Sequence, residues 1–176
     1  MITVVLYGIT GGRVADEIKR ILSHYGIISV RGTNIEEIKE NAEFLLIECT
    51  TSANINSEKG IIVMTGEISE SFQLKLPRTY KGIVFSSDRI ALKKLMENKI
   101  TTVSCGMSNK DTMVLSSVTD DTASVCLQRK IITINGNEVE PCEFPVKLKT
   151  PITDYALLAA FAILLLSDIK PHGGEY

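Results

Sequence analysis

The stretch that most constrains the fold is the first 22 residues of the chain. An apolar run over residues 2–6 predicts a buried strand, and a glycine-rich turn, Gly8-Ile9-Thr10-Gly11-Gly12-Arg13, follows it directly. Apolar residues then recur at helical spacing, at Val14, Ile18, Ile21 and Leu22. A strand, glycine turn and helix in this order bring backbone N–H groups and a helix N-terminus together, which suits a phosphate. The pattern predicts an α/β fold and an anion-binding turn.

Strands and helices continue to alternate through the first 105 residues. Five further apolar runs predict strands over residues 27–30, 44–49, 61–65, 82–85 and 101–105. A capping-box pattern, Thr33-Asn34-Ile35-Glu36, predicts a short helix that ends near Asn41. Ser86-Ser87-Asp88 predicts the cap of another helix, with its apolar face at Ala91, Leu92, Leu95 and Met96. This alternation predicts a mostly parallel sheet flanked by helices in three layers, P-loop-like or Rossmann-like.

The pattern changes between residues 112 and 148, where no helical periodicity is found. Strands are predicted over residues 113–118, 122–128, 130–134 and 139–148, with a hairpin turn at Asn135-Gly136-Asn137. Thr150 and Pro151 then predict the N-cap and first turn of a final helix that runs to about Ser167. We therefore expect one domain over residues 1–170, with a small antiparallel β unit at 112–148 and a loose tail at 171–176.

Composition limits the functional classes. Lysine and arginine number 19 against 21 acidic residues, so nothing indicates nucleic-acid binding. The apolar run at 156–166 is shorter than the roughly 20 residues that span a bilayer, and we expect a buried core helix and no membrane association. The start lacks the basic region of a signal peptide, so we expect a cytoplasmic protein. The four cysteines of the chain form no CxxC pair, and we expect them to be free thiols.

The order of these parts resembles the central, ATP-binding domain of the Mur ligases, peptidoglycan enzymes that join amino acids to UDP-MurNAc. Residues 83–88 (Ile-Val-Phe-Ser-Ser-Asp) are similar to the family's strand that ends in an Asn-Asp-Asp type motif. Residues 101–106 are similar to the family's strand that precedes a β excursion. Residues 145–148 and the helix that contains Ala159-Ala160 are similar to the end of the family's domain. The resemblance covers residues 2–168 and implies a binding site for ATP with Mg²⁺.

The chain departs from this family at the functional positions. The family's phosphate loop reads Gly-Thr-Asn-Gly-Lys-Thr-Thr, and here Gly12 and Arg13 replace its lysine and its metal-binding hydroxyl. Arginine can pair with phosphate but cannot ligate a metal. On the last helix, Ile152, Thr153 and Ala156 stand where the family has polar groups. The segment between Thr65 and Gly82 is much shorter than in the family, whose catalytic histidine and modified lysine lie there.

Each candidate binding residue also has a purely structural interpretation. Gly8, Thr10, Gly11, Gly12 and Arg13 are candidates for contact with nucleotide phosphate, yet a tight turn alone also requires small residues. The resemblance implies that Glu48 binds Mg²⁺, while a solvated carboxylate at the end of a strand is the simpler interpretation. Asp88 fits the end of the family's acidic motif and would contact nucleotide, or it caps the following helix.

A second interpretation of the N-terminus is a dinucleotide-binding turn. Residues 8–12 also resemble turns that read Gly-x-Thr-Gly, and Arg31 follows the second strand, where some enzymes bind the 2′-phosphate of NADP. This alternative explains neither the β unit nor the last helix.

Three functional hypotheses follow. The first is a Mur-ligase-like domain without ligase activity that binds a nucleotide, a UDP-sugar-like anion or a protein partner in cell-wall-related biology. The second is an ATP-dependent ligase subunit completed by a partner, in which Arg13, Glu48 and Asp88 act. The third is an interaction module, for which the many apolar strands suggest a homodimer.

Overall fold

The computed structural model describes residues 1–10, 12–38, 41–51, 57–69, 76–77, 79–172 and 174–176. Within these residues the chain forms a ten-stranded sheet in the order β12-β9-β8-β7-β6-β5-β1-β4-β2-β3. The strands from β8 to β2 in this order pair in parallel: β1 (Ile2–Tyr7), β2 (Ile27–Arg31), β4 (Phe44–Cys49), β5 (Gly60–Met64), β6 (Lys81–Phe85), β7 (Thr101–Gly106) and β8 (Met113–Val118). The outer strands pair antiparallel: β3 (Asn34–Ile38), β9 (Thr122–Leu127) and β12 (Cys142–Lys147).

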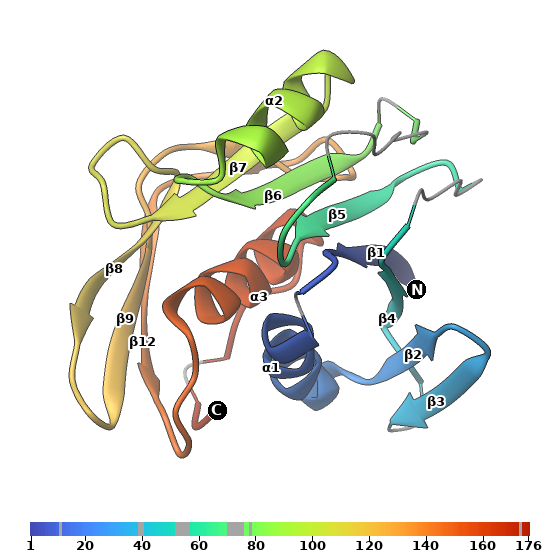
Figure 1. The fold of residues 1–176 in the computed structure, drawn as a ribbon. Helices are drawn as coiled ribbons and strands as arrows, with labels where there is room; N and C mark the ends of the chain where they lie inside the picture. The colour runs from blue at the N-terminus through green and yellow to red at the C-terminus, as the bar shows by residue number, and fades with distance from the viewer. Residues whose placement is uncertain (11, 39–40, 52–56, 70–75, 78, 173) are drawn as a thin grey trace.

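Helices lie on both faces of this sheet, as predicted (Figure 1). Helices α1 (Gly12–Leu22) and α3 (Asp154–Leu166) pack against each other on one face. Helix α2 (Arg89–Glu97) lies on the other face, over β6 and β7. A single 3₁₀ turn, η1 (Ser23–Tyr25), follows α1. The three-layer α/β architecture predicted from the sequence is confirmed.

Helix α3 is apolar on all sides, and α1 and the strands of the sheet cover it. All residues from Ala156 to Leu166 are buried. The helix contacts α1 and strands β5 to β9, and β8, β9 and β12 curve around it (Figure 1). A helix without a polar face is expected only inside a protein or a membrane. No helix within the described residues is long and apolar enough to cross a bilayer.

The segment predicted as a helix after Thr33 is instead strand β3, so this prediction was wrong. Strands β2 and β3 form a hairpin in which Arg31 pairs with Asn34 across the two-residue turn Gly32-Thr33. Gly32 has a φ of +59°, which glycine adopts without strain. Pairing with β2 supplies backbone hydrogen bonds along the segment, and this outweighs the local capping-box signal.

The β unit before the last helix is confirmed, but its boundaries differ from the prediction. The strand predicted over residues 139–148 is divided into β11 (Glu138–Val139) and β12, on either side of Pro141. Strand β10 (Ile131–Ile132) pairs with β11 in a separate two-stranded antiparallel sheet, across the predicted Asn-Gly turn. Helix α3 begins three residues later than predicted, because Thr153 and not Thr150 is its N-cap and accepts a hydrogen bond from the N–H of Ala156.

The tail predicted to be loose packs against the domain. The N–H of Tyr176 donates to the carbonyl of Lys147 (2.9 Å), and the N–H of Lys147 donates to the carbonyl of Gly174 (3.2 Å). Tyr176 is 8% exposed, and its ring lies edge-on to that of Phe161. Tyr176, the one aromatic residue of this polar, glycine-containing tail, makes these contacts.

Candidate functional site

A pocket of about 400 Å³ opens at the carboxyl ends of β1, β2 and β4. Its wall includes Gly8 and Gly12 from the turn between β1 and α1, and Arg31 and Glu48 from the ends of β2 and β4. Ligands of open α/β sheets bind at this edge, where the strand order changes direction. The structure thus brings two of the predicted turn glycines and the predicted metal ligand Glu48 into one cavity.

The glycine turn is fastened to the loop that follows β5. A Cβ atom on Gly8 would lie 2.5 Å from the backbone nitrogen of Gly66, so only glycine fits there. The N–H of Ile9 donates to the carbonyl of Glu67 (3.0 Å), and the N–H of Glu67 donates to the hydroxyl of Thr10 (3.3 Å). Gly8 and Thr10 therefore have a structural role whatever the pocket binds. Gly11 lies outside the described residues.

Gly12 has no such steric requirement. A Cβ atom on Gly12 would have no atom within 4 Å, and the residue is exposed at the first position of α1. The absence of a side chain leaves the backbone at this helix N-terminus open to the pocket, where unpaired N–H groups and the helix dipole favour an anion.

Arg31 is held inside the pocket rim by two carboxylates. Its Nε donates to Glu48 Oε2 (2.7 Å), and its Nη2 donates to Asp16 Oδ1 (2.8 Å). The hydrogen bond to Glu48 is the main cause that raises the pKa of Arg31. Glu48 is thus paired with a cation of the same chain, and an incoming metal ion would compete with Arg31 for it. Sequence reasoning did not identify Asp16. It lies 15 residues before Arg31, and that spacing gives no sign that the two side chains meet.

Thr65 is a buried polar residue in the same wall. It follows β5, is 6% exposed and lines the pocket. Its hydroxyl lies beside the glycine turn, because a Cβ atom on Gly8 would be 3.0 Å from Thr65 Oγ1. A hydroxyl can both donate to and accept from a ligand in this cavity.

Arg13 and Asp88, which were also predicted to contact nucleotide, do not line this pocket. The Arg13 guanidinium lies 3.0 Å from Glu17 on the next turn of α1. Asp88 caps α2, accepting a hydrogen bond from the N–H of Ala91 (2.9 Å), so the predicted capping role is confirmed. Contact of either residue with nucleotide stays a prediction.

The residues present do not by themselves form a metal centre. Among the described residues, no group of three or more histidine, cysteine, aspartate or glutamate side chains could hold a metal ion. Mg²⁺ is commonly bound by one or two carboxylates together with substrate phosphates. Glu48 fits that second mode only, in which the ion accompanies a nucleotide.

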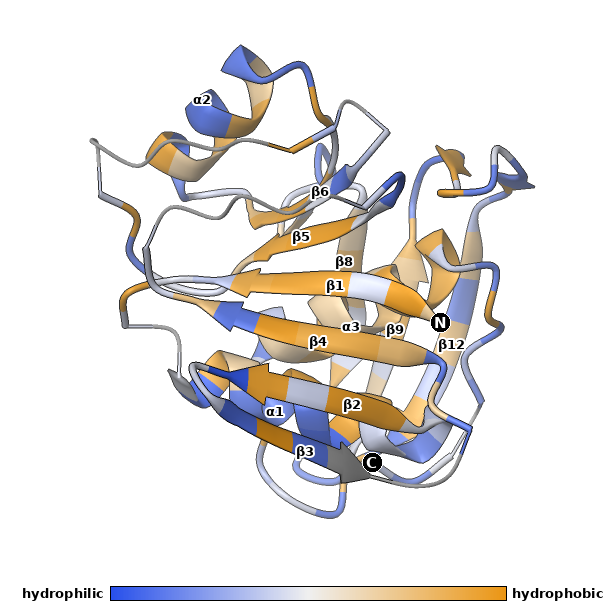
Figure 2. Cartoon of the chain, turned by 90° about the vertical axis from the view of Figure 1, so that its right-hand side faces the viewer, coloured by the Kyte–Doolittle hydropathy of each residue, from blue (hydrophilic) through white to orange (hydrophobic). Residues whose placement is uncertain are grey.

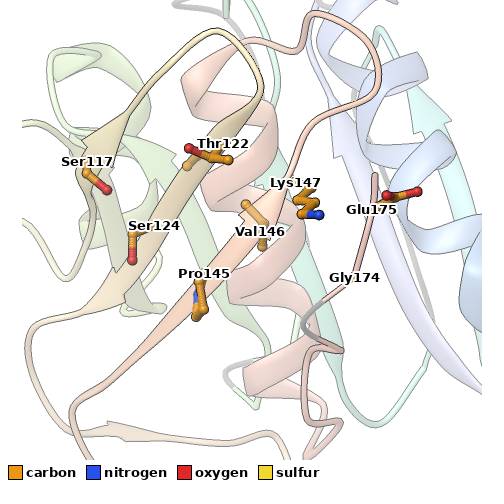
Figure 3. Close-up of a pocket in the computed structure, with 9 residues that line it drawn as sticks. Ser117, Thr122, Ser124, Pro145, Val146, Lys147, Gly174 and Glu175 are labelled. Carbon is orange, nitrogen blue, oxygen red and sulfur yellow. The ribbon is translucent and has the colours of Figure 1, made fainter.

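A larger hollow, of about 670 Å³, lies elsewhere, along β9 and β12 beside the tail (Figure 3). Ser117, Thr122 and Ser124 contribute hydroxyls to its wall, and Lys147 and Glu175 lie on the side of the tail. The hollow is more open than the smaller pocket, and its polar groups are spread over β8, β9, β12 and the tail. We therefore assign the candidate site to the smaller pocket, in which the polar groups converge.

The strand order separates this fold from the usual dinucleotide-binding arrangement. In that arrangement the first two strands, joined by the first helix, are neighbours in the sheet. Here β4 lies between β1 and β2 and pairs in parallel with both. The order therefore gives no support to the NADP alternative, although Arg31 does line the pocket.

No established sequence family and no curated protein matches this chain. Its fold is similar to that of a UDP-N-acetylmuramoyl-L-alanyl-D-glutamate–2,6-diaminopimelate ligase, with a TM-score of 0.55 and 10% identity over 96% of this chain. It is also similar to the UDP-N-acetylmuramate:L-alanyl-gamma-D-glutamyl-meso-diaminopimelate ligase of Neisseria meningitides, with a TM-score of 0.59 and 10% identity over 95% of this chain. The chain spans 43% and 62% of the lengths of these two proteins. The resemblance predicted from the order of elements is thus confirmed at the level of the fold, and the chain has a Mur-ligase-like α/β fold.

Proposed function

We propose that this chain is a binding domain that holds the phosphates of a nucleotide or of a UDP-sugar-like ligand in the pocket between Gly8 and Glu48. The observation that carries the proposal is a pocket at the N-terminus of α1 whose wall includes Gly8, Gly12 and the buried residue Thr65. Backbone N–H groups at Gly12 and the hydroxyl of Thr65 would both donate to phosphate oxygens.

The charges around the pocket favour a ligand that arrives with a cation. Arg31 is neutralised by Glu48 and Asp16, so this group of three side chains carries one net negative charge. A bare anion would meet that charge, whereas Mg²⁺ bound to its phosphates would offset it. We therefore expect binding to depend on Mg²⁺, with Glu48 as the carboxylate closest to the ion.

We propose further that the chain has no ligase activity by itself. The loop that resembles the family's phosphate loop carries Gly12 in place of its lysine and Arg13 in place of its metal-binding hydroxyl. In the structure, Arg13 pairs with Glu17 and lies outside the pocket wall. The two similar structures are those of UDP-N-acetylmuramyl ligases, which supports a cell-wall-related ligand for this chain.

Calorimetric titration of the purified chain tests the proposal. The ligands are ATP with and without Mg²⁺, then UDP-MurNAc and NADPH. We expect Mg²⁺-dependent binding of ATP or UDP-MurNAc in the micromolar range, a free energy of about 8 kcal/mol. Binding of NADPH alone would favour the dinucleotide alternative, and formation of an amide product from ATP would favour the ligase subunit.

Two conservative variants localise the binding. Thr65→Val removes the hydroxyl and keeps the side-chain shape, so we expect it to weaken binding about tenfold. Arg129→Gln is the control, because Arg129 is exposed just after the end of β9, donates to the carbonyl of Asn109 (3.4 Å) and lies outside the pocket wall. Absence of binding for all ligands, or equal binding by the Thr65→Val variant, would contradict the proposal.

A further inference from the structure

The sheet itself brings together the ion pair at the rim of the candidate pocket. Arg31 ends β2, and Glu48 lies one residue before the end of β4. The two residues stand opposite each other in the parallel pairing of these strands. Figure 2 shows β4 and β2 side by side, apolar along most of their length and hydrophilic near their carboxyl ends. Because paired residues of neighbouring strands project to the same face of the sheet, the two charged side chains meet there.

Helix α1 adds a second carboxylate on that face. The Nη2 atom of Arg31 lies 2.7 Å from Glu48 Oε2 and 2.8 Å from Asp16 Oδ1. One nitrogen atom thus lies between two carboxylates, where a shared cation would lie. Among the described residues, no other basic side chain pairs with either carboxylate. The guanidinium therefore stands in for a cation at this place, and it belongs to the chain itself.

Glu48 depends on a cation more than Asp16 does. The side chain of Glu48 is 14% exposed, whereas those of Asp16 and Arg31 are 61% and 55% exposed. A largely buried carboxylate that loses its partner is destabilising, while an exposed carboxylate is stabilised by water. Glu48 thus needs a cation, but its present partner lies at the exposed rim, where it can be exchanged.

Asp16 gives the guanidinium a second place to stay. If a divalent cation takes the oxygen atoms of Glu48, Arg31 can keep its hydrogen bond to Asp16. The exchange changes the net charge of the three side chains and the ion from one negative to one positive. The rim then attracts a phosphate, whose oxygen atoms can complete the coordination of the ion. Without the ion, the negative rim disfavours a bare anion.

We infer that Arg31 is a built-in counter-ion that closes the Glu48 position until a divalent cation displaces it, and that Asp16 then retains the guanidinium. The inference deepens the proposed function, and the part that names phosphate as the ligand rests on it. The exchange of cations at Glu48, however, can be measured without any nucleotide.

Titration of the full chain with Mn²⁺, with the free ion followed by electron paramagnetic resonance, tests the exchange. Mn²⁺ prefers the same oxygen ligands as Mg²⁺. We expect weak binding by wild type, and a dissociation constant that Arg31→Gln lowers by at least about tenfold. Arg31→Lys keeps the charge but lacks the planar fork that reaches both carboxylates, so it should give a smaller gain. The double variant Arg31→Gln/Glu48→Gln should lose the gain.

Lys130→Gln is the matched control, because Lys130 also lies between two carboxylates. Its Nζ is 2.9 Å from Glu138 and 3.4 Å from Glu140, beside the hairpin of β10 and β11 and outside the pocket wall. The side chains of these two glutamates are 58% and 70% exposed, so water stabilises them when the lysine is removed. Mn²⁺ binding by this variant should stay at the wild-type level.

The outcomes are distinct. A gain in Mn²⁺ affinity with Arg31→Gln that is absent from the double variant and from Lys130→Gln supports the counter-ion. No gain in either Arg31 variant overturns it, because Arg31 would then not occupy a cation position. An equal gain with Lys130→Gln also overturns it, because net charge alone would explain the effect. If the exchange is observed but ATP and UDP-MurNAc do not bind, the proposed function fails and the role of Arg31 stands.

Discussion

Glu17 joins the two helices on one face of the sheet through a single carboxylate. Its Oε2 accepts hydrogen bonds from the backbone N–H (3.0 Å) and the hydroxyl (2.5 Å) of Thr153, the N-cap residue of α3. Its Oε1 accepts from Arg13 (3.0 Å). Burial acts to raise the pKa of Glu17, but the hydrogen bonds from Thr153 and Arg13 outweigh it and hold the pKa below its ordinary value. The charged form therefore stabilises the fold.

The substitution Glu17→Gln should lower the free energy of unfolding by about 1–3 kcal/mol at pH 7. The folded-state pKa of Glu17 lies below the unfolded value, about 4.3. Its contribution is therefore fully present above that pH and is lost as the pH falls through the folded-state pKa. The gap between wild type and variant should narrow below about pH 4, in urea unfolding measured over a pH series.

The control for this change is Glu97→Gln. Glu97 is exposed and its carboxylate lies 3.9 Å from Lys93 on the same helix, so the change should have little effect on stability at any pH. A gap between wild type and the Glu17→Gln variant that stays constant from pH 7 to acid would show that its charge contributes nothing to stability.

At the scale of the element, the turn between β1 and α1 contains two glycines with different roles. Gly8 is required by close packing, and Gly12 has no steric requirement. Gly8→Ala places a Cβ atom 2.5 Å from the backbone of Gly66, and we expect a loss of about 1–3 kcal/mol in the free energy of unfolding. Gly12→Ala meets no atom within 4 Å and replaces glycine by a better helix former, so we expect no loss, or a gain of up to about 1 kcal/mol.

Denaturant unfolding of the two variants tests this prediction, and titration with ATP then separates packing from binding. Equal stability of the Gly8→Ala and Gly12→Ala variants would mean that the loop carrying Gly66 can shift to accept a side chain. A Gly12→Ala variant that is stable but binds ATP more weakly would place the ligand against the N-terminus of α1.

The elements that sequence reasoning identified are those with the strongest local signals. The buried strands β1, β4, β5, β6 and β7 are short apolar runs, and α1 has an unbroken helical period. Strand β3 was missed because its Thr-x-x-Glu pattern favours a helix locally, while the deciding interaction is a pairing with β2. Local patterns carry no information about which partner strand is available.

The sequence also predicted only part of the candidate site, because local patterns do not show which strands are neighbours. Gly8, Gly12 and Glu48 could be placed near one another because each follows or ends a predicted parallel strand, and such ends meet at one edge of the sheet. The ion pair between Arg31 and Glu48 depends on β2 lying next to β4, and the place of Thr65 in the pocket wall depends on where β5 ends. Neither follows from spacing along the chain.

At the scale of the whole molecule, the tail closes the domain on the side of α1 and α3. The hydroxyl of Tyr176 donates to the carbonyl of His172 (2.9 Å), and its ring centre lies 5.7 Å from that of Phe161 on α3. Tyr25, just after α1, has its hydroxyl 3.2 Å from the Tyr176 hydroxyl. One aromatic residue thus contacts groups from the beginning, the last helix and the tail of the chain.

Two substitutions at Tyr176 measure how firmly the tail is held. Tyr176→Phe removes only the hydroxyl and should cost about 1 kcal/mol. Tyr176→Ala also removes the aromatic ring of a buried residue, and the loss in the free energy of unfolding should be about 3 kcal/mol in denaturant titrations. If the alanine variant were as stable as wild type, the tail would be loose, as its polar, glycine-containing sequence predicts. A graded loss would show that both the hydroxyl and the ring contribute to stability at the place where the antiparallel unit, the last helix and the N-terminal half meet.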